Sequence, residues 1–516
     1  MNPWKHFSRE SRQWLAAAAL AALALTSCRG LHDVSGRTQS IPVSHSSSTR
    51  ISRAVKSSTG GHPGESGFHL LLNGHDAFAA RLVLADSAEK SLDVQYFIWK
   101  NDLTGRLLTE RLLRAADRGV HVRVLLDDVG SMAPDDKLAA LDSHPNIEIR
   151  LFNPARVRSP KLVGIAWEPM RLNRRMHNKS FTADGVVSIL GGRNIADEYF
   201  SANETMNFAD LDVAMIGPAV KDVTSSFEIY WNSRASIEMA SVYKSTHTER
   251  DLAIVRENLA HHEAVVRDSE YATSIRDCKL NGYLKSRSVP YQWGGARVIY
   301  DSPDKVLHPD EDTLLAKKLV DEANGTRKEL YLVSPYFVPG KSGVDLLTAV
   351  RRKGQRVVVI TNSLASNDGL HVHGGYKKYR KPLLREGIEI YEMKPDSNSQ
   401  DWSMAASSGA SLHSKTFAFD RKTLFVGSYN LDPRSRNLNT EIGVLIDSEN
   451  LANAMASTAD HLREEKMYRV VLEGERLVWI SQENGKEVRY YKEPATSWSR
   501  RAMANIFGLL PIEGQL

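Results

Sequence analysis

Two stretches of the sequence carry the same chemically active residues at the same spacing. The first copy is His177-x-Lys179, four more residues, Asp184, six more residues and Gly191-Gly192-Arg193-Asn194; the second is His413-x-Lys415, Asp420 and Gly427-Ser428-Tyr429-Asn430 at the same intervals. Both His-x-Lys sequences lie in runs of β-forming residues, and alternate side chains of a strand share one face. Two imidazoles and two ammonium groups in one cleft can transfer a phosphoryl group: one imidazole attacks phosphorus, the other protonates the leaving oxygen, and the ammonium groups neutralise the phosphate oxygens.

Other residues of the pattern are expected to complete this site. The predicted catalytic set is His177, Lys179, Asp184, His413, Lys415 and Asp420, with the two aspartates in support rather than at the phosphorus. The predicted substrate-binding residues are Asn194, Asn430 and Ser428, with Gly192 in the place of the serine in the first copy. Aligning 209–213 with 440–444 pairs Asp210 with Glu441, and a carboxylate beside an imidazole sets its tautomer. The His and Asp residues are not spaced as a metal-ligand triad, so we expect no metal and no other cofactor.

The elements that must position these residues repeat along the chain. Strand-like runs at 92–99 and 122–127 alternate with helical patterns at 76–88 and 107–118, and the same order returns over 313–361. This predicts an α/β fold of two similar halves, each a mixed, mostly parallel sheet flanked by helices, packed with pseudo-two-fold symmetry around one site within a monomer. The expected segments are a first domain at 67–235, a helical connector at 236–289, a second domain at 290–465, and a C-terminal hairpin and helix at 466–516.

Composition excludes several classes of protein. The chain has 516 residues, 42% of them hydrophobic and 25% charged, which is typical of a globular protein rather than a polytopic membrane protein or a disordered chain. The net charge of +5 is too small to indicate a nucleic-acid-binding protein. Cys28 and Cys278 are the only cysteines, which excludes a disulfide scaffold.

The N-terminus has the pattern of a bacterial export signal. A basic start is followed by an apolar run at 14–25 and then by Leu25-Thr26-Ser27-Cys28, which resembles a lipobox. We therefore expect residues 1–27 to be a signal peptide, Cys28 to be lipidated and 28–66 to form a flexible tether; a plain secretory signal is the alternative. Arg29 stands where inner-membrane lipoproteins often carry aspartate, which favours a periplasm-facing lipoprotein of the outer rather than the inner membrane.

The repeated pattern resembles the signature of the phospholipase D superfamily, which occurs once in each half. The stretch 171–180 and the elements 92–99 and 336–339 are similar to bacterial cardiolipin synthases, especially the C-type branch. This resemblance implies a membrane-bound phosphatidyltransferase in which His177 is the nucleophile and His413 the acid and then the base. It also implies cardiolipin synthesis from phosphatidylglycerol, with a phospholipid or glycerol-containing acceptor.

Several alternatives stay open at the level of sequence. The same mechanism with water as the acceptor would release phosphatidic acid, which would make the protein a hydrolytic phospholipase D. The superfamily motif also occurs in nucleases, although the charge and the lipid anchor argue against nucleic acid as a partner. A third alternative is an inert lipid-binding module. The apolar and basic segment 498–510 is expected either to contact a membrane interface or to pack on the body of the protein.

Overall fold

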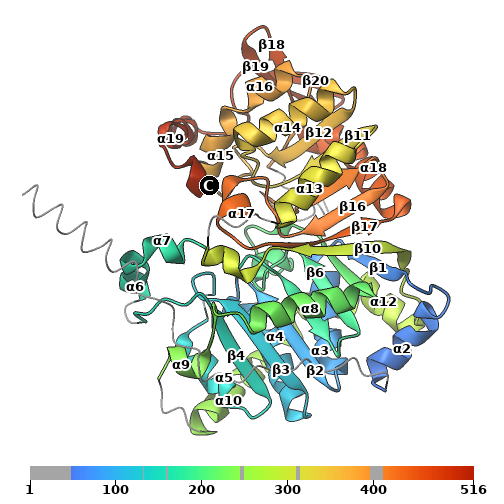
Figure 1. Cartoon of the computed structure of the whole chain (residues 1–516), viewed down its shortest axis with the longest axis vertical. Helices are drawn as coiled ribbons and strands as arrows, with labels where there is room; N and C mark the ends of the chain where they lie inside the picture. The colour runs from blue at the N-terminus through green and yellow to red at the C-terminus, as the bar shows by residue number, and fades with distance from the viewer. Residues whose placement is uncertain (1–47, 132, 159–160, 245–248, 309–313, 396–410) are drawn as a thin grey trace, which may run out of the picture.

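The structure is a computed structural model that describes residues 48–516 except 132, 159–160, 245–248, 309–313 and 396–410 (Figure 1). The predicted signal peptide, the lipidation residue Cys28 and most of the predicted tether lie outside the described residues.

The first half is built on a mixed sheet flanked by helices. Its strands run in the spatial order β4 (Ile147–Phe152), β3 (His121–Asp127), β2 (Ser91–Tyr96), β5 (Ser180–Ala183), β6 (Val187–Gly191), β8 (Asp212–Ile216) and β1 (Ser66–Leu71). The pairs β2–β3 and β3–β4 are parallel and the others antiparallel. Its main helices are α3 (Gly74–Ser87), α4 (Leu103–Asp117), α5 (Asp135–Asp142) and α8 (Ala219–Trp231).

The second half repeats this strand order. The sequence of neighbours is β13 (Glu389–Met393), β12 (Arg356–Asn362), β11 (Glu329–Val333), β15 (Thr416–Phe419), β16 (Thr423–Gly427), β17 (Ile442–Asp447) and β10 (Gln292–Tyr300). Its helices are α13 (Leu314–Gly325), α14 (Gly340–Arg352), α15 (Leu370–Lys377), α16 (Arg380–Arg385), α17 (Pro433–Asn437) and α18 (Glu449–Lys466). Since β1 pairs antiparallel with β10, the two halves join into one 18-stranded sheet, and the predicted duplicated α/β fold is confirmed.

Local sequence explains where these elements form. Strand β12 reads Arg-Val-Val-Val-Ile-Thr-Asn and is buried from its second residue onward, as expected for a parallel strand covered on both faces. Helix α4 begins where the side chain of Asp102 accepts a hydrogen bond from the Gly105 amide, and α18 begins where Ser448 caps the Leu451 amide in the same way.

Part of the predicted tether is helical. Helix α2 (Arg50–Thr59) lies within 28–66, is capped by Thr49, and buries Ile51 in the core of the first half. Val55, one turn later on the same face, packs against that core, so two apolar residues at helical spacing are enough to fold this polar segment onto the body.

The predicted connector is helical but belongs to the first half. It starts with β9 (Ser236–Glu238), which pairs antiparallel with β4 and so extends the first sheet. Helices α9 (Met239–Val242), α10 (Glu249–Val266), α11 (Glu270–Arg276) and α12 (Lys279–Ser286) follow. Helix α10 packs against α4 and α5, while α11 and α12 pack against α3, so this segment covers one side of the first domain.

The C-terminal elements match the predicted hairpin and helix. Strand β18 (Met467–Glu473) pairs with β13, and β19 (Arg476–Glu483) and β20 (Lys486–Tyr490) form a hairpin. Asn484 and Gly485 both have positive φ, the backbone that a tight hairpin turn needs. Helix α19 (Trp498–Leu509) packs against α15. Within the described part of the chain, no helix combines the length and apolar character needed to cross a bilayer.

Candidate active site

The two motif histidines lie in extended chain just before β5 and β15, at the contact between the halves. Those strands begin at Ser180 and Thr416, so each His-x-Lys lies in the entry to its strand rather than within it. The His177 amide donates to the Thr440 carbonyl at 2.8 Å, and the His413 amide donates to the Ala209 carbonyl, also at 2.8 Å. Each histidine is thus anchored by the backbone of the opposite half.

The side chains are paired across the halves in the same way. Nδ1 of His177 lies 2.8 Å from Oε2 of Glu441, and Nδ1 of His413 lies 2.6 Å from Oδ2 of Asp210. Both carboxylates are fully buried and both histidine residues are only 7% exposed. Because a carboxylate accepts the Nδ1 proton, Nε2 of each imidazole carries the chemistry. The predicted acids are therefore at the site, each serving the histidine of the other motif.

The two lysines lie against their own histidines. Nζ of Lys179 donates to the His177 carbonyl at 2.6 Å, and Nζ of Lys415 lies 2.9 Å from Nδ1 of His413. Burial holds the pKa of Lys179 well below its usual range and lowers that of Lys415 to about 8. A bound phosphodiester would add negative charge beside these lysines and so favour their protonated forms, which suits an anionic substrate.

The electrostatics of the two histidines differ. Burial and the charges of Lys179 and Lys415 hold the pKa of His177 well below its usual range. Burial and Lys415 also lower the pKa of His413, but Asp210 opposes that shift. His177 therefore favours the neutral form of a nucleophile, whereas His413 is the better placed of the two to carry a proton.

The two carboxylates differ correspondingly. Burial raises the pKa of Glu441 to about 7, against the opposing effect of Lys179 and of hydrogen bonds from Ser428 and Ser435. Burial also acts to raise the pKa of Asp210, but His413, Lys415 and Arg193 together outweigh it, and the pKa lies below its usual value. The ionised Asp210 stabilises a positive charge on His413 better than Glu441 does on His177.

The sequence matches the family described as "Cardiolipin synthase, PLD-like domain" over residues 82–231 and 319–463, each of which contains one motif. Cardiolipin synthase C of Escherichia coli K12 is 42% identical over 470 residues, which is 90% of this chain and 99% of that protein. The chain belongs to the cardiolipin synthase family of phospholipase D-like proteins. The predicted family is thereby confirmed.

More distant members of the cardiolipin synthase family and of its fold also match. A cardiolipin synthase of Oceanobacillus iheyensis is 25% identical, over 74% of this chain and 66% of that protein. The solved phosphatidylserine synthase of Haemophilus influenzae Rd KW20 has a TM-score of 0.54 and 13% identity, and the match covers 81% of this chain and 91% of that one. At this identity the second likeness shows the shared fold alone.

The predicted phosphate-binding residues of this cardiolipin synthase family member divide into two groups. The side chain of Asn194 is hydrogen-bonded within the protein at both ends. Its Oδ1 accepts a hydrogen bond from the Ile98 amide, and its Nδ2 donates to the Tyr199 hydroxyl at 2.9 Å. Ser428 donates to Glu441, so it orients a carboxylate. Asn430 differs, because its buried Oδ1 has no partner among the described residues. Of these side chains, Asn430 is the one whose amide remains a candidate for substrate contact.

Position 192 requires a glycine for a steric reason that the sequence did not indicate. A Cβ at this position would lie 2.2 Å from Oδ1 and 2.7 Å from Oδ2 of Asp210. In the second copy, Ser428 occupies the same place and its hydroxyl donates to Glu441. The glycine therefore gives Asp210 the room it needs to reach His413.

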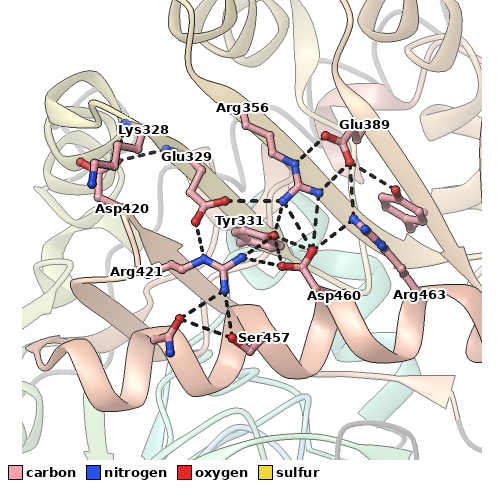
Figure 2. A network of polar contacts seen from close by, with 12 residues as sticks. Lys328, Glu329, Tyr331, Arg356, Glu389, Asp420, Arg421, Ser457, Asp460 and Arg463 are labelled. Atoms are coloured by element: carbon pink, nitrogen blue, oxygen red, sulfur yellow. Dashed lines mark hydrogen bonds and ion pairs between the residues drawn. The ribbon is translucent and has the colours of Figure 1, made fainter.

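Asp184 and Asp420, the two aspartates predicted to support the site, each bind a loop of the backbone. Asp184 accepts the amides of Glu89, Lys90 and Ser91, at the loop that leads into β2. Figure 2 shows Asp420 beside Lys328 and Glu329, and it accepts the amides of residues 327–329 in the equivalent loop before β11. Both residues have positive φ, and the hydrogen bonds of both carboxylates go to loop amides. Their role is to close that loop in each half.

Replacing Asp184 by alanine should therefore destabilise the protein rather than stop catalysis. Three amides would lose a charged acceptor, at a cost of about 3 kcal/mol in the free energy of unfolding. We expect the activity of the remaining folded protein to stay within about threefold of wild type, since no contact with either histidine is lost. Denaturant unfolding measures the free energy of unfolding, and initial rates measure the activity. Asp184→Asn is the matched control, and unchanged stability with a large loss of activity would contradict this role.

Sequence reasoning missed the aromatic residues that surround the imidazoles. The ring of Phe97 packs edge-on at 5.1 Å from the ring of His177, while Tyr199 and Phe208 lie 5.1 and 5.0 Å from the ring of His413. These rings limit the rotation of the imidazoles and exclude water. Tyr199 could have been found from the repeat, because it stands five residues after Asn194, as Ser435 stands five residues after Asn430.

Ser435 was missed as well. Its hydroxyl donates to Oε1 of Glu441 at 2.7 Å, while Ser428 donates to Oε2. Two hydroxyls thus hold Glu441 in position. In the described part of the chain there is no group of three or more His, Cys, Asp or Glu residues arranged to hold a metal ion.

Proposed function

We propose that this protein transfers phosphatidyl groups by forming a covalent bond between phosphorus and Nε2 of His177, and that its product is cardiolipin. The observation that carries this mechanism is the crosswise pairing of two imidazoles with Glu441 and Asp210, with two buried lysines beside them. The names of its relatives support the product. Cardiolipin synthesis makes phospholipids the substrates and a membrane the place of the reaction.

The first half of the reaction forms the intermediate. Nε2 of His177 attacks the phosphorus of phosphatidylglycerol as the bond from phosphorus to the headgroup oxygen breaks. His413 gives its Nε2 proton to that oxygen, and glycerol leaves. Lys179 and Lys415 offset the charge that develops on the phosphate oxygens.

The second half transfers the phosphatidyl group. The glycerol hydroxyl of a second phosphatidylglycerol gives its proton to His413, and its oxygen bonds to phosphorus as the bond to His177 breaks. Asp210 stabilises His413 while it holds the proton. Release of cardiolipin returns both imidazoles to their starting forms.

The N-terminal anchor belongs to the same proposal. Lipidation of Cys28 would hold the catalytic body at the envelope membrane of a bacterium, on the periplasmic side, with the outer membrane favoured by Arg29. Both motifs come from one chain and complete each other's histidines, which supports a monomer as the active unit. Labelling of Cys28 by a fatty-acid analogue in growing cells would test the anchor.

The function is tested by turnover of phosphatidylglycerol in vesicles, with products identified by mass spectrometry. We expect cardiolipin and glycerol in equal amounts, with activity retained in the presence of a chelator. Phosphatidic acid as the main product would mean that water is the acceptor and that the protein is a hydrolase. Cleavage of DNA without lipid turnover would contradict the proposal.

A further inference from the structure

Two segments of the protein expose large apolar side chains to solvent. In α19, Trp498 is 77% exposed, Ile506 is 54% exposed and Leu509 is 86% exposed. In the segment of α6 (Lys161–Trp167) and α7 (Pro169–Leu172), Trp167 is 56% exposed and Met170 is 70% exposed. Soluble surfaces seldom gather side chains of this kind, so a group of them indicates a contact surface. We call these five residues the apolar face.

The two segments lie on the same side of the molecule. Figure 1 shows α6, α7 and α19 along the left edge, on either side of the C-terminus. A direct contact joins them: the side chain of Asn173, at the end of α7, donates to Gln515, just beyond α19. Arg434 binds both Asn173 and the carbonyl of Gln515. The apolar face is therefore formed by two segments, one from each half, that lie on the same side of the protein and are linked through Asn173, Arg434 and Gln515.

Both segments of the apolar face are placed by parallel strands of the sheets. Segment α6–α7 follows the carboxyl end of β4, and α7 ends five residues before His177. Helix α15, against which α19 packs, follows the carboxyl end of β12. In α/β sheets, substrates approach from the carboxyl ends of the parallel strands. A lipid drawn from a surface in contact with the apolar face would have a short way to the two histidines.

The inner side of α19 is firmly attached, so its outer side is left for a partner. Ala504 is fully buried, and Gly508 and Gly374 allow the two helices close approach, since a Cβ on Gly508 would lie 3.0 Å from the Gly374 carbonyl oxygen. Arg500 is also fixed, because its guanidinium donates to the carbonyls of Leu364 and Asn367. Packing of this kind leaves Trp498, Ile506 and Leu509 projecting outward from a rigid support.

Charge and composition identify the partner. Helix α19 contains Arg500 and Arg501 and no acidic residue. Both guanidinium groups donate to neutral carbonyl oxygens, so their positive charge is held on this side of the protein without a carboxylate of the described residues to offset it. In α6–α7, Glu168 is paired with Arg171 at 2.7 Å, so it adds no unbalanced negative charge. Exposed Trp, Leu and Ile beside arginine is the composition of helices that lie in the interface of an anionic bilayer.

We propose that the apolar face docks the enzyme onto an anionic phospholipid bilayer, with α19 and α6–α7 entering the headgroup region on either side of the approach to the site. The proposal rests on the proposed function only for the statement that the substrate is a phospholipid. The contact with a bilayer is inferred from the exposed side chains alone. The face would set the orientation of the catalytic body on the lipid, which lipidation at Cys28 by itself would not set.

Site-specific labels test the contact. In the full chain with Cys28→Ser and Cys278→Ser, a polarity-sensitive fluorophore is attached to Met170→Cys, to Leu509→Cys or to the control Ala454→Cys, which lies in α18 at the opposite edge (Figure 1). On adding vesicles of phosphatidylglycerol and phosphatidylethanolamine, the labels at 170 and 509 should shift to the blue and the label at 454 should not. Membrane insertion of residues 14–25 alone would leave all three unshifted and overturn the proposal.

Three other results of the labelling experiment would also contradict a shared docking face. A shift at only one of the two positions would exclude a shared face, and a shift at all three would mean nonspecific adsorption. A shift that depends on protein concentration without vesicles would make a second copy the occupant. Each of these results overturns the proposal.

Activity gives an independent measurement. The double variant Met170→Glu/Leu509→Glu should turn over phosphatidylglycerol in vesicles at least about tenfold more slowly, because two large side chains no longer enter the bilayer. Its turnover of short-chain phosphatidylglycerol below the micelle concentration should stay within about twofold of wild type. Equal losses on both substrates would overturn the proposal. If the wild type turns over neither lipid while labels 170 and 509 shift, the proposed function fails and the docking face stands.

Discussion

Replacing His177 by alanine should lower the turnover of phosphatidylglycerol by about 10⁴-fold, because the atom that attacks phosphorus is removed. Glu441 would then be left buried without its imidazole partner, so the variant is also expected to lose some stability. Initial rates by mass spectrometry measure the effect. Thermal unfolding shows whether the protein is still folded, and a folded variant with more than a tenth of the wild-type rate would exclude His177 as the nucleophile.

His413→Ala is the matched comparison, because the two histidines have equivalent surroundings but different proposed roles. With phosphatidylglycerol, His413→Ala should lose about as much activity as His177→Ala. With an analogue whose leaving group is p-nitrophenol, which needs no acid, His413→Ala should still release a burst of nitrophenol equal to the enzyme concentration. His177→Ala should give no burst. The reverse pattern would exchange the roles of the two residues.

Replacing Gly192 by alanine should lower kcat by about 10²-fold. The new methyl group would lie 2.2 Å from Oδ1 of Asp210, a distance that real contacts do not reach, so Asp210 must move. It would lose its 2.6 Å contact with His413, and displacements of about 1 Å at a catalytic group cost on this order. Rates with phosphatidylglycerol measure the effect.

Two controls separate this effect from a general cost of the substitution. Ser428→Ala changes the equivalent position of the second motif without adding bulk, and should cost less than about tenfold, since Glu441 keeps its bond from Ser435. Gly282→Ala, on the exposed α12 with nothing within 4 Å of the added methyl group, should leave activity unchanged. Full activity of Gly192→Ala would show that the position of Asp210 does not matter.

Local features were predictable because they depend on residues close together in the chain. The hairpin turn at Asn484-Gly485 required a positive φ that these residues adopt readily. The β-branched run of β12 and the apolar, valine-containing sequence of β3 gave strands at the expected places. Helix α2 was missed because only Ile51 and Val55 in that polar segment are apolar enough to bury. Its docking depends on a surface of the first half that sequence patterns do not describe.

The sequence by itself determined the chemistry: two His-x-Lys motifs in a duplicated chain name the atoms that handle a phosphodiester. Tertiary structure decided how they are used. His177 meets Glu441 across 264 residues and His413 meets Asp210 across 203, because the strand order of each half and the junction of β1 with β10 bring each motif against the other half. Within each half, the fold places Asp184 and Asp420 against loop amides. The spacing of a motif shows which residues recur together. It does not show which residues far away in the chain they will contact, because those contacts form only when the two sheets pack against each other.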